Sequence, residues 1–107
     1  MDPRIALRES DTLSNEEFAE ILKRLDRLDN ASKVGAWTQE VLELVSNNPE
    51  LVSGELAKKA NLEKPWLKLN IRKLKNLGLT VSLEVGYRIS PRGIEVLHRL
   101  RQLNPSR

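Results

Sequence analysis

The hydrophobic pattern of the chain changes its period after Gly78, and this change limits the folds that the chain can adopt. Before Gly78, apolar residues recur three or four positions apart, as they do on amphipathic helices. Residues 80–84 and 87–89 then alternate, which is typical of two short strands joined by a turn. The helical pattern resumes after Ser90-Pro91. The sequence therefore predicts a mainly α fold with a small β-hairpin.

Five segments carry the apolar spacing of a helix that is buried on one side. They are residues 15–29, 34–46, 54–61, 64–77 and 91–103. Residues 1–13 show no period and are expected to form a flexible terminus. Leu51-Val52 is expected to be a short extended piece. Because no linker or repeat divides these segments, we expect a single body.

Residues that favour helix starts stand before three of these segments. Ser14 and Glu17 have the spacing of a capping box for the first helix. Asn30 or Ser32 can cap the second helix, and Ser53 can cap the third.

Composition excludes several classes of protein. The 107 residues include no cysteine and a single histidine, His98. Disulfides and thiol catalysis are therefore excluded, and a histidine-built metal site or catalytic triad is improbable. No apolar run approaches the roughly 18 residues of a membrane span, and the charged start is unlike a signal peptide. We expect a chain that is not an enzyme, needs no cofactor or metal, and does not enter a membrane.

Charge is divided unevenly along the chain. Residues 1–50 carry six basic and eleven acidic side chains, whereas residues 51–107 carry twelve basic and four acidic ones. Residues 64–83 include no acidic residue at all. Such a basic half can be a solvated surface, but it is also what a phosphate-binding surface requires.

Three runs in the basic half resemble a known family. They are Val-Ser-Gly-Glu-Leu-Ala at 52–57, Leu-Lys-Asn-Leu-Gly-Leu at 74–79 and Tyr-Arg-Ile-Ser-Pro-Arg-Gly at 87–93. In this order they resemble the winged helix-turn-helix of bacterial and archaeal transcription regulators, above all the multiple-antibiotic-resistance and arsenic-resistance regulators. The resemblance implies a winged helix-turn-helix domain over residues 31–107, with residues 14–30 as an additional helix. It also implies that residues 64–77 enter the major groove of DNA and that residues 80–89 form a short wing.

The resemblance implies a set of DNA-binding residues. A helical wheel of residues 64–77 places Pro65, Leu69 and Arg72 opposite the apolar stripe, between Lys68 and Lys73. Lys64, Arg88 and Arg92 are further phosphate candidates, and Trp66 lies at the edge of the outer face. The predicted DNA-binding residues are thus Lys64, Pro65, Trp66, Lys68, Leu69, Arg72, Lys73, Arg88 and Arg92.

Trp66 and Leu69 also permit a different interpretation. A tryptophan-centred apolar surface is typical of protein–protein contacts, so the same helix could belong to a protein-interaction module. Trp66 could equally be part of the core. Charge reversal at Arg72 and truncation of Trp66 should separate these readings.

The helix at residues 15–29 carries an apolar stripe that is too short for a lone coiled coil. The stripe can pack over the last helix of the same chain or against a partner chain. Regulators of the resembled type commonly dimerise through terminal helices, so the resemblance implies a homodimer bound to double-stranded DNA. We expect a cytoplasmic, nucleoid-associated transcriptional regulator whose acidic first half lies away from the DNA.

Overall fold

The computed structural model describes residues 13–33 and 35–103 of the chain. Residues 1–12, which we expected to be flexible, and Val34, which we expected in the second helix, lie outside the described part. The elements are, in order, α2 (Asn15–Ala31), α3 (Thr38–Asn47), α4 (Ser53–Ala60), α5 (Lys64–Asn76), β1 (Thr80–Ser82), β2 (Tyr87–Ile89) and α6 (Pro91–Leu103). The prediction of a mainly helical fold with one small hairpin is confirmed for these residues.

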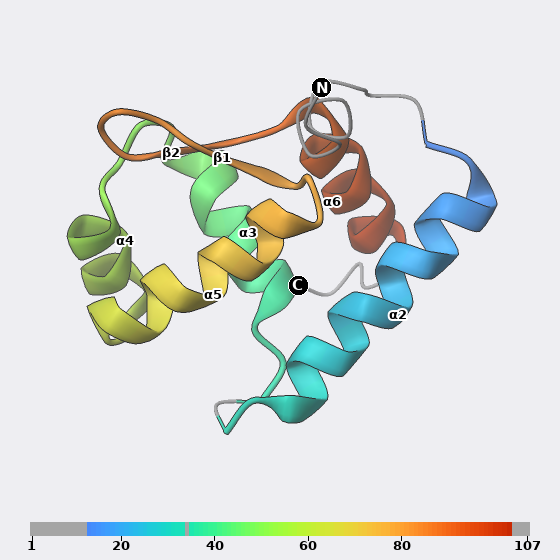
Figure 1. Cartoon of the computed structure of the whole chain (residues 1–107), viewed down its shortest axis with the longest axis horizontal. Helices are drawn as coiled ribbons and strands as arrows, with labels where there is room; N and C mark the ends of the chain where they lie inside the picture. The colour runs from blue at the N-terminus through green and yellow to red at the C-terminus, as the bar shows by residue number, and fades with distance from the viewer. Residues whose placement is uncertain (1–12, 34, 104–107) are drawn as a thin grey trace.

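The helix α3 is central, because it contacts α2, α4, α6 and β2. In Figure 1, α5 crosses in front of α3, with α4 and the tip of the hairpin on the left and α2 and α6 on the right. No other element covers α5 in this view. Among the described residues, no helix has both the length and the apolar content needed to cross a membrane.

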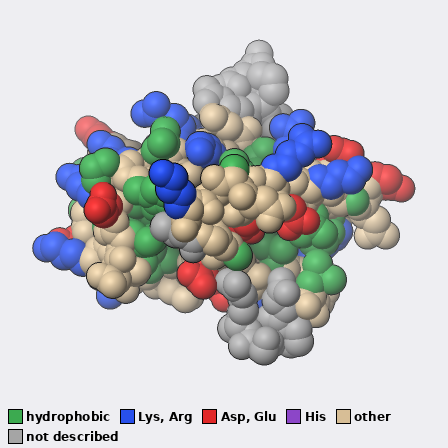
Figure 2. All heavy atoms as spheres, turned by 90° about the horizontal axis from the view of Figure 1, so that it is seen from below, with side chains coloured by type: hydrophobic (Ala, Val, Ile, Leu, Met, Phe, Trp, Pro, Cys, Tyr) green, Lys and Arg blue, Asp and Glu red, His purple; other side chains and the backbone are tan. Residues whose placement is uncertain are grey.

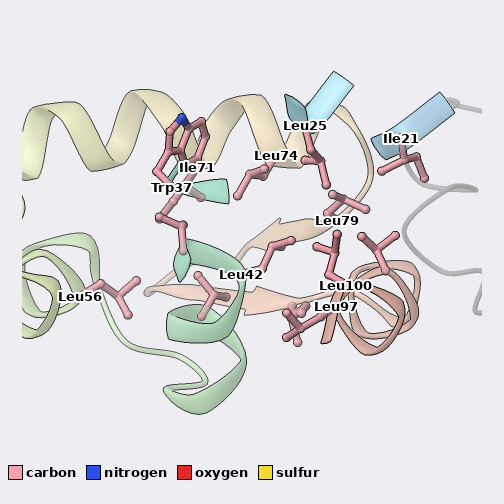
Figure 3. Packing of buried hydrophobic residues seen from close by; sticks show 14 of the residues in the cluster. Ile21, Leu25, Trp37, Leu42, Leu56, Ile71, Leu74, Leu79, Leu97 and Leu100 are labelled. Atoms are coloured by element: carbon pink, nitrogen blue, oxygen red, sulfur yellow. The ribbon is translucent and has the colours of Figure 1, made fainter. Parts of the chain in front are cut away.

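The core is aliphatic and receives side chains from every helix. Figure 3 shows Ile21 and Leu25 of α2 pointing into the same cluster as Leu74, Leu79 and Leu100. The stripe of α2 is therefore buried within its own chain. The capping box is confirmed, because Ser14 Oγ accepts from Glu17 N at 3.1 Å while Glu17 Oε1 accepts from Ser14 N at 3.3 Å.

The start of α2 is tied to α6. Leu13, which we assigned to the flexible terminus, is buried in the core at 7% exposure. Arg99 of α6 donates from Nη2 to the Leu13 carbonyl at 2.5 Å, and its guanidinium lies 5.4 Å from the centre of the Phe18 ring. Leu13 is therefore part of the folded body, although the hydrophobic period does not include it.

The helix α3 begins at Thr38, four residues later than predicted, and neither Asn30 nor Ser32 caps it. Its cap is Asp29, near the end of α2. The Asp29 carboxylate accepts from Trp37 N at 2.8 Å, Thr38 N at 2.9 Å and Thr38 Oγ1 at 2.9 Å. The loop folds back, so the capping carboxylate comes from the preceding helix.

The helix α4 includes Ser53 as its first residue, so Ser53 is not the cap that we predicted. Val52 stands at the cap position and makes no side-chain capping bond. The helix ends at Ala60 and is followed by the C-cap Asn61, whose φ of 55° is left-handed. Asparagine tolerates that conformation, which turns the chain sharply towards α5.

The segment before α4 is not a strand, but it is fixed to the hairpin. Glu50 N donates to Tyr87 O at 2.8 Å. Gly86 lies so close that a Cβ there would be 2.2 Å from Glu50 O, and its φ is +85°. Only glycine fits this close approach, which locks the hairpin against the loop between α3 and α4.

The junction of α5, the hairpin and α6 is equally tight. Gly78 ends α5 with a φ of +80°, as predicted. Ser90 Oγ donates to Gly78 O at 2.6 Å and accepts from Gly93 N at 2.9 Å, so one hydroxyl joins the end of α5 to the start of α6. A Cβ at Gly93 would lie 2.1 Å from Leu79 O, which explains the glycine. These contacts fix α5 relative to the hairpin.

Candidate functional site

One face of α5 is buried and the other is open to solvent. Leu67, Ile71 and Leu74 are at most 1% exposed, as the predicted stripe requires. On the opposite side Leu69 is 54% exposed. The structure also exposes the other residues that were predicted for this outer face, which are Lys64, Pro65, Lys68, Arg72 and Lys73.

The cations of α5 have no acidic partners. The helix carries no Asp or Glu, and within the described residues none of its cationic side chains makes an ion pair or hydrogen bond. These side chains are Lys64, Lys68, Arg72, Lys73 and Lys75. Unpaired cations on a rigid helix repel one another and attract polyanions.

The cations of α6 are different, because each one has a carboxylate partner. Arg99 Nε lies 2.9 Å from Glu95 Oε1, and Arg101 pairs with Glu43 of α3. The guanidinium of Arg92 lies 2.9 Å from Glu17 of α2. The pairs of Arg92 and Arg101 fasten α6 to α2 and α3. Among the described cations of the basic half that make no ion pair, most therefore sit on α5, with Lys59 and Arg88 outside it.

Arg92 does not belong to the open surface, although we predicted it as a phosphate contact. Its side chain is 7% exposed and is covered by α2. The hydrogen bond from Arg92 is the main reason that the pKa of Glu17 is lowered, and the capping bonds of Ser14 add to it. Because reaching a phosphate would break this buried contact, we leave Arg92 out of the candidate interface.

Trp66 is half-buried and packs into the body of the molecule. Its ring meets the buried Trp37 edge to face, with centroids 5.4 Å apart and an interplanar angle of 78°. The Trp66 carbonyl accepts from the buried Asn70 side chain at 2.8 Å. Of the apolar groups that suggested a protein contact, only Leu69 and Pro65 remain fully on the surface.

The hairpin presents one cation. Arg88 of β2 is exposed and lies opposite Val81 of β1 in the register. The turn beyond it carries Glu84 and Val85, of which Val85 is 66% exposed. The hairpin is therefore short, with its basic side chain on the strand rather than at the tip.

A second basic feature was missed by sequence reasoning. Arg24 and Arg27 of α2 line one depression of about 260 Å³ together with Lys73 and Leu77 of the α5 end. In Figure 2, Lys and Arg side chains lie mainly in the upper half and at the left of the view, and acidic side chains are scattered among them on both sides. The i, i+3 spacing of the two arginines was visible in the sequence, but their position beside α5 was not.

The chain has no match among known protein families, curated proteins or solved structures. The geometry and charge of the α5 surface are therefore the features that point to a function.

Proposed function

We propose that the protein binds double-stranded DNA as a winged helix-turn-helix transcriptional regulator, with α5 in the major groove. The observation that carries this proposal is the outer face of α5, on which the cationic side chains are exposed and unpaired. The order of α4, α5, hairpin and α6 supports it, because this order is what the resemblance to winged regulators implies.

The dimensions of α5 fit this function. A helix with its side chains is about 10–12 Å wide, and the major groove of B-DNA is about 12 Å wide. Arg72 lies at the centre of the outer face, where its guanidinium can make two hydrogen bonds to a guanine edge. Lys68 and Lys73 flank it and can reach phosphates. Leu69 offers an apolar contact for a thymine methyl group.

The hairpin adds a contact beside the groove. Arg88 is exposed on β2, and the tie between Glu50 and Tyr87 holds the hairpin in place. In this function Arg88 contacts the DNA backbone, whereas the acidic tip at Glu84 stays outside the minor groove. The protein would then act at the genome, in the cytoplasm and associated with the nucleoid.

Homodimerisation, which the resemblance implies, remains a prediction. The centres of the apolar stripes, Ile21 and Leu25 of α2 and Val96, Leu97 and Leu100 of α6, are buried within one chain. A dimer therefore needs another surface, for which Leu103 and Ile94 offer exposed apolar side chains on α6. Sedimentation equilibrium over a hundredfold range of protein concentration tests this prediction.

The alternative function is a protein-interaction module that uses the Trp66 and Leu69 surface. The exposure of Leu69 favours it, because 54% of this large apolar residue faces solvent. Trp66 counts against it, since the contact with Trp37 already occupies one side of its ring.

The decisive test is fluorescence anisotropy of a labelled random-sequence duplex titrated with the protein between 50 and 200 mM salt. Contacts to about four phosphates give a slope of about −3.6 in log K against log salt, which is a loss of about 150-fold over this range. Arg72→Glu should remove most of the binding, whereas Leu69→Ala should change it little.

Arg101→Gln is the matched control, because it removes an arginine charge from α6 that is already paired with Glu43. It should leave the slope nearly unchanged. Absence of binding by the unmodified protein at 50 mM salt would overturn the proposal. If Leu69→Ala reduces the affinity for the duplex more than Arg72→Glu does, the protein-interaction module is favoured instead.

A further inference from the structure

The helix α2 brings two arginines to the C-terminal end of α5. Arg24 and Arg27 are exposed and lie one turn apart on α2. With Lys73 they surround the depression of about 260 Å³, whose remaining lining includes Leu28 and Leu77. We call this depression the α2–α5 pocket. Three cationic side chains from two helices thus converge on one opening with a partly apolar floor.

None of these three cations is neutralised by a carboxylate within the described residues. Three glutamates, Glu16, Glu17 and Glu20, line the adjoining depression, which Arg24 also borders. Glu17 is engaged with Arg92, and Glu20 lies 3.7 Å from Lys23.

The remaining acids of α2, Asp26 and Asp29, do not line the pocket. Asp26 and Asp29 line a different depression, on the side of α2 that faces α3 and α6. The α2–α5 pocket is therefore positive on the side that continues into α5.

The helix dipole of α5 offsets only a small part of this positive charge. A helix C-terminus carries roughly half a negative charge, and its effect is confined to the last turn. The last carbonyls of α5 are also bonded, since Leu77 N, Gly78 N and Leu79 N donate to carbonyls of Leu74 and Lys75. Three full positive charges thus exceed what the helix end can balance, and their mutual repulsion favours an added anion.

The pocket is continuous with the outer face of α5. Lys73 lines the pocket and lies next to Arg72, the central residue of the proposed groove contact. A DNA strand that follows the outer face of α5 is therefore led over the end of the helix towards α2.

We infer that the α2–α5 pocket is a binding site for backbone phosphates of duplex DNA, with Arg24 and Arg27 as the phosphate ligands and Lys73 shared with α5. This inference rests on the proposed function and extends it, because it assigns a binding role to a helix outside the winged part of the fold. Guanidinium groups suit phosphate oxygens, to which they donate two parallel hydrogen bonds.

The site has a measurable consequence for affinity. Each phosphate contact contributes about 0.9 to the salt slope. Two contacts from α2 therefore add about 1.8, which corresponds to about 60-fold in affinity at 0.1 M salt relative to 1 M. Arg24 and Arg27 of α2 then take part in binding, so the acidic first half of the chain is only partly turned away from DNA.

The test compares three variants of the full chain in the anisotropy titration with a random-sequence duplex. Arg24→Gln/Arg27→Gln should lower the salt slope by about 1.8 and weaken binding at 0.1 M by up to about 60-fold. Lys23→Gln is the matched control, because Lys23 lies on the same helix, pairs with Glu20 and does not line the pocket. It should leave the slope nearly unchanged. Arg72→Gln reports on the α5 contact separately.

A direct measurement accompanies the variants and needs no substitution. Addition of duplex should shift the Nε–H resonances of Arg24 and Arg27 in the unmodified protein, and circular dichroism confirms that the double variant keeps its fold. An unchanged slope in the double variant, with Arg72→Gln still weakening binding, would overturn the α2 site and leave the proposed function intact.

If the unmodified protein binds no duplex, the proposed function fails first. In that case a shift of the same two resonances with inorganic phosphate alone would assign the pocket to a free phosphate ligand, and it would overturn the DNA backbone as its occupant.

Discussion

Replacement of Leu25 by alanine tests whether α2 is part of the same cooperative body as the rest of the chain. Leu25 is 1% exposed and lies in the core beside Leu74 (Figure 3). The substitution removes three carbon atoms, which at about 0.8 kcal/mol each costs about 2.4 kcal/mol in transfer free energy. The space left behind opens onto the depression bordered by Thr38 and Leu100, so water can enter it and the cavity cost stays small. We expect the free energy of unfolding to fall by about 3 kcal/mol.

Urea unfolding followed by tryptophan fluorescence measures this loss, because Trp37 and Trp66 both report on the core. The urea concentration at the midpoint of unfolding should fall, while the slope m of free energy against urea concentration stays constant. In thermal unfolding, the melting temperature should drop by roughly 10–20 °C. Leu69→Ala is the control. It removes the same atoms from a residue that is 54% exposed, so its effect should stay within about 0.5 kcal/mol.

Two results would refute this reasoning. A loss below about 1 kcal/mol for Leu25→Ala would show that α2 is not packed as described. A loss that depends on protein concentration would show that a second chain supplies the helix, because packing within one chain is independent of concentration.

Three further outcomes follow from single contacts. Gly86→Ala places a Cβ 2.2 Å from Glu50 O at a φ of +85°, so we expect a loss of about 1–3 kcal/mol in thermal unfolding. Asp29→Ala removes the cap of α3 and should cost about 1–2 kcal/mol, with faster hydrogen exchange in the first turn of α3. The lowered pKa of Glu17 stabilises the folded state above the ordinary glutamate value of 4.5, and this contribution is lost as the pH falls through the lowered value. In acid titrations, Glu17→Gln should therefore remove that part of the pH dependence, whereas an unchanged profile would show that the bond to Arg92 does not contribute.

The helix α5 and the hairpin were predictable because their signals are local. The apolar stripe around Ile71, the proline at the start and Gly78 at the end define α5 within one residue. A period of two and a glycine turn define the hairpin. The exposed residues of α5 follow from the same wheel, since burial on one side of a helix determines which residues face solvent.

The contacts that the sequence did not reveal all join segments distant in the chain. Arg92 has the same local appearance as Arg88, but α2 covers Arg92 and leaves Arg88 exposed. Asp29 caps α3 from eight or nine residues upstream, which no capping pattern describes. The α2–α5 pocket depends on how Arg24 and Lys73 meet in space, which is determined by core packing and not by spacing along the chain.

The cap that Asp29 supplies has a consequence for where this body can be cut. A fragment that starts at residue 31, where the winged part was expected to begin, lacks both the capping carboxylate and the carbonyl of Leu28 that accepts the Trp37 indole at 3.2 Å. It also removes Ile21 and Leu25 from the core cluster that contains Leu74 and Leu100. The amide protons of α2 and of the first turn of α3 should therefore exchange as one unit, and the shortest autonomous folding unit should include both helices.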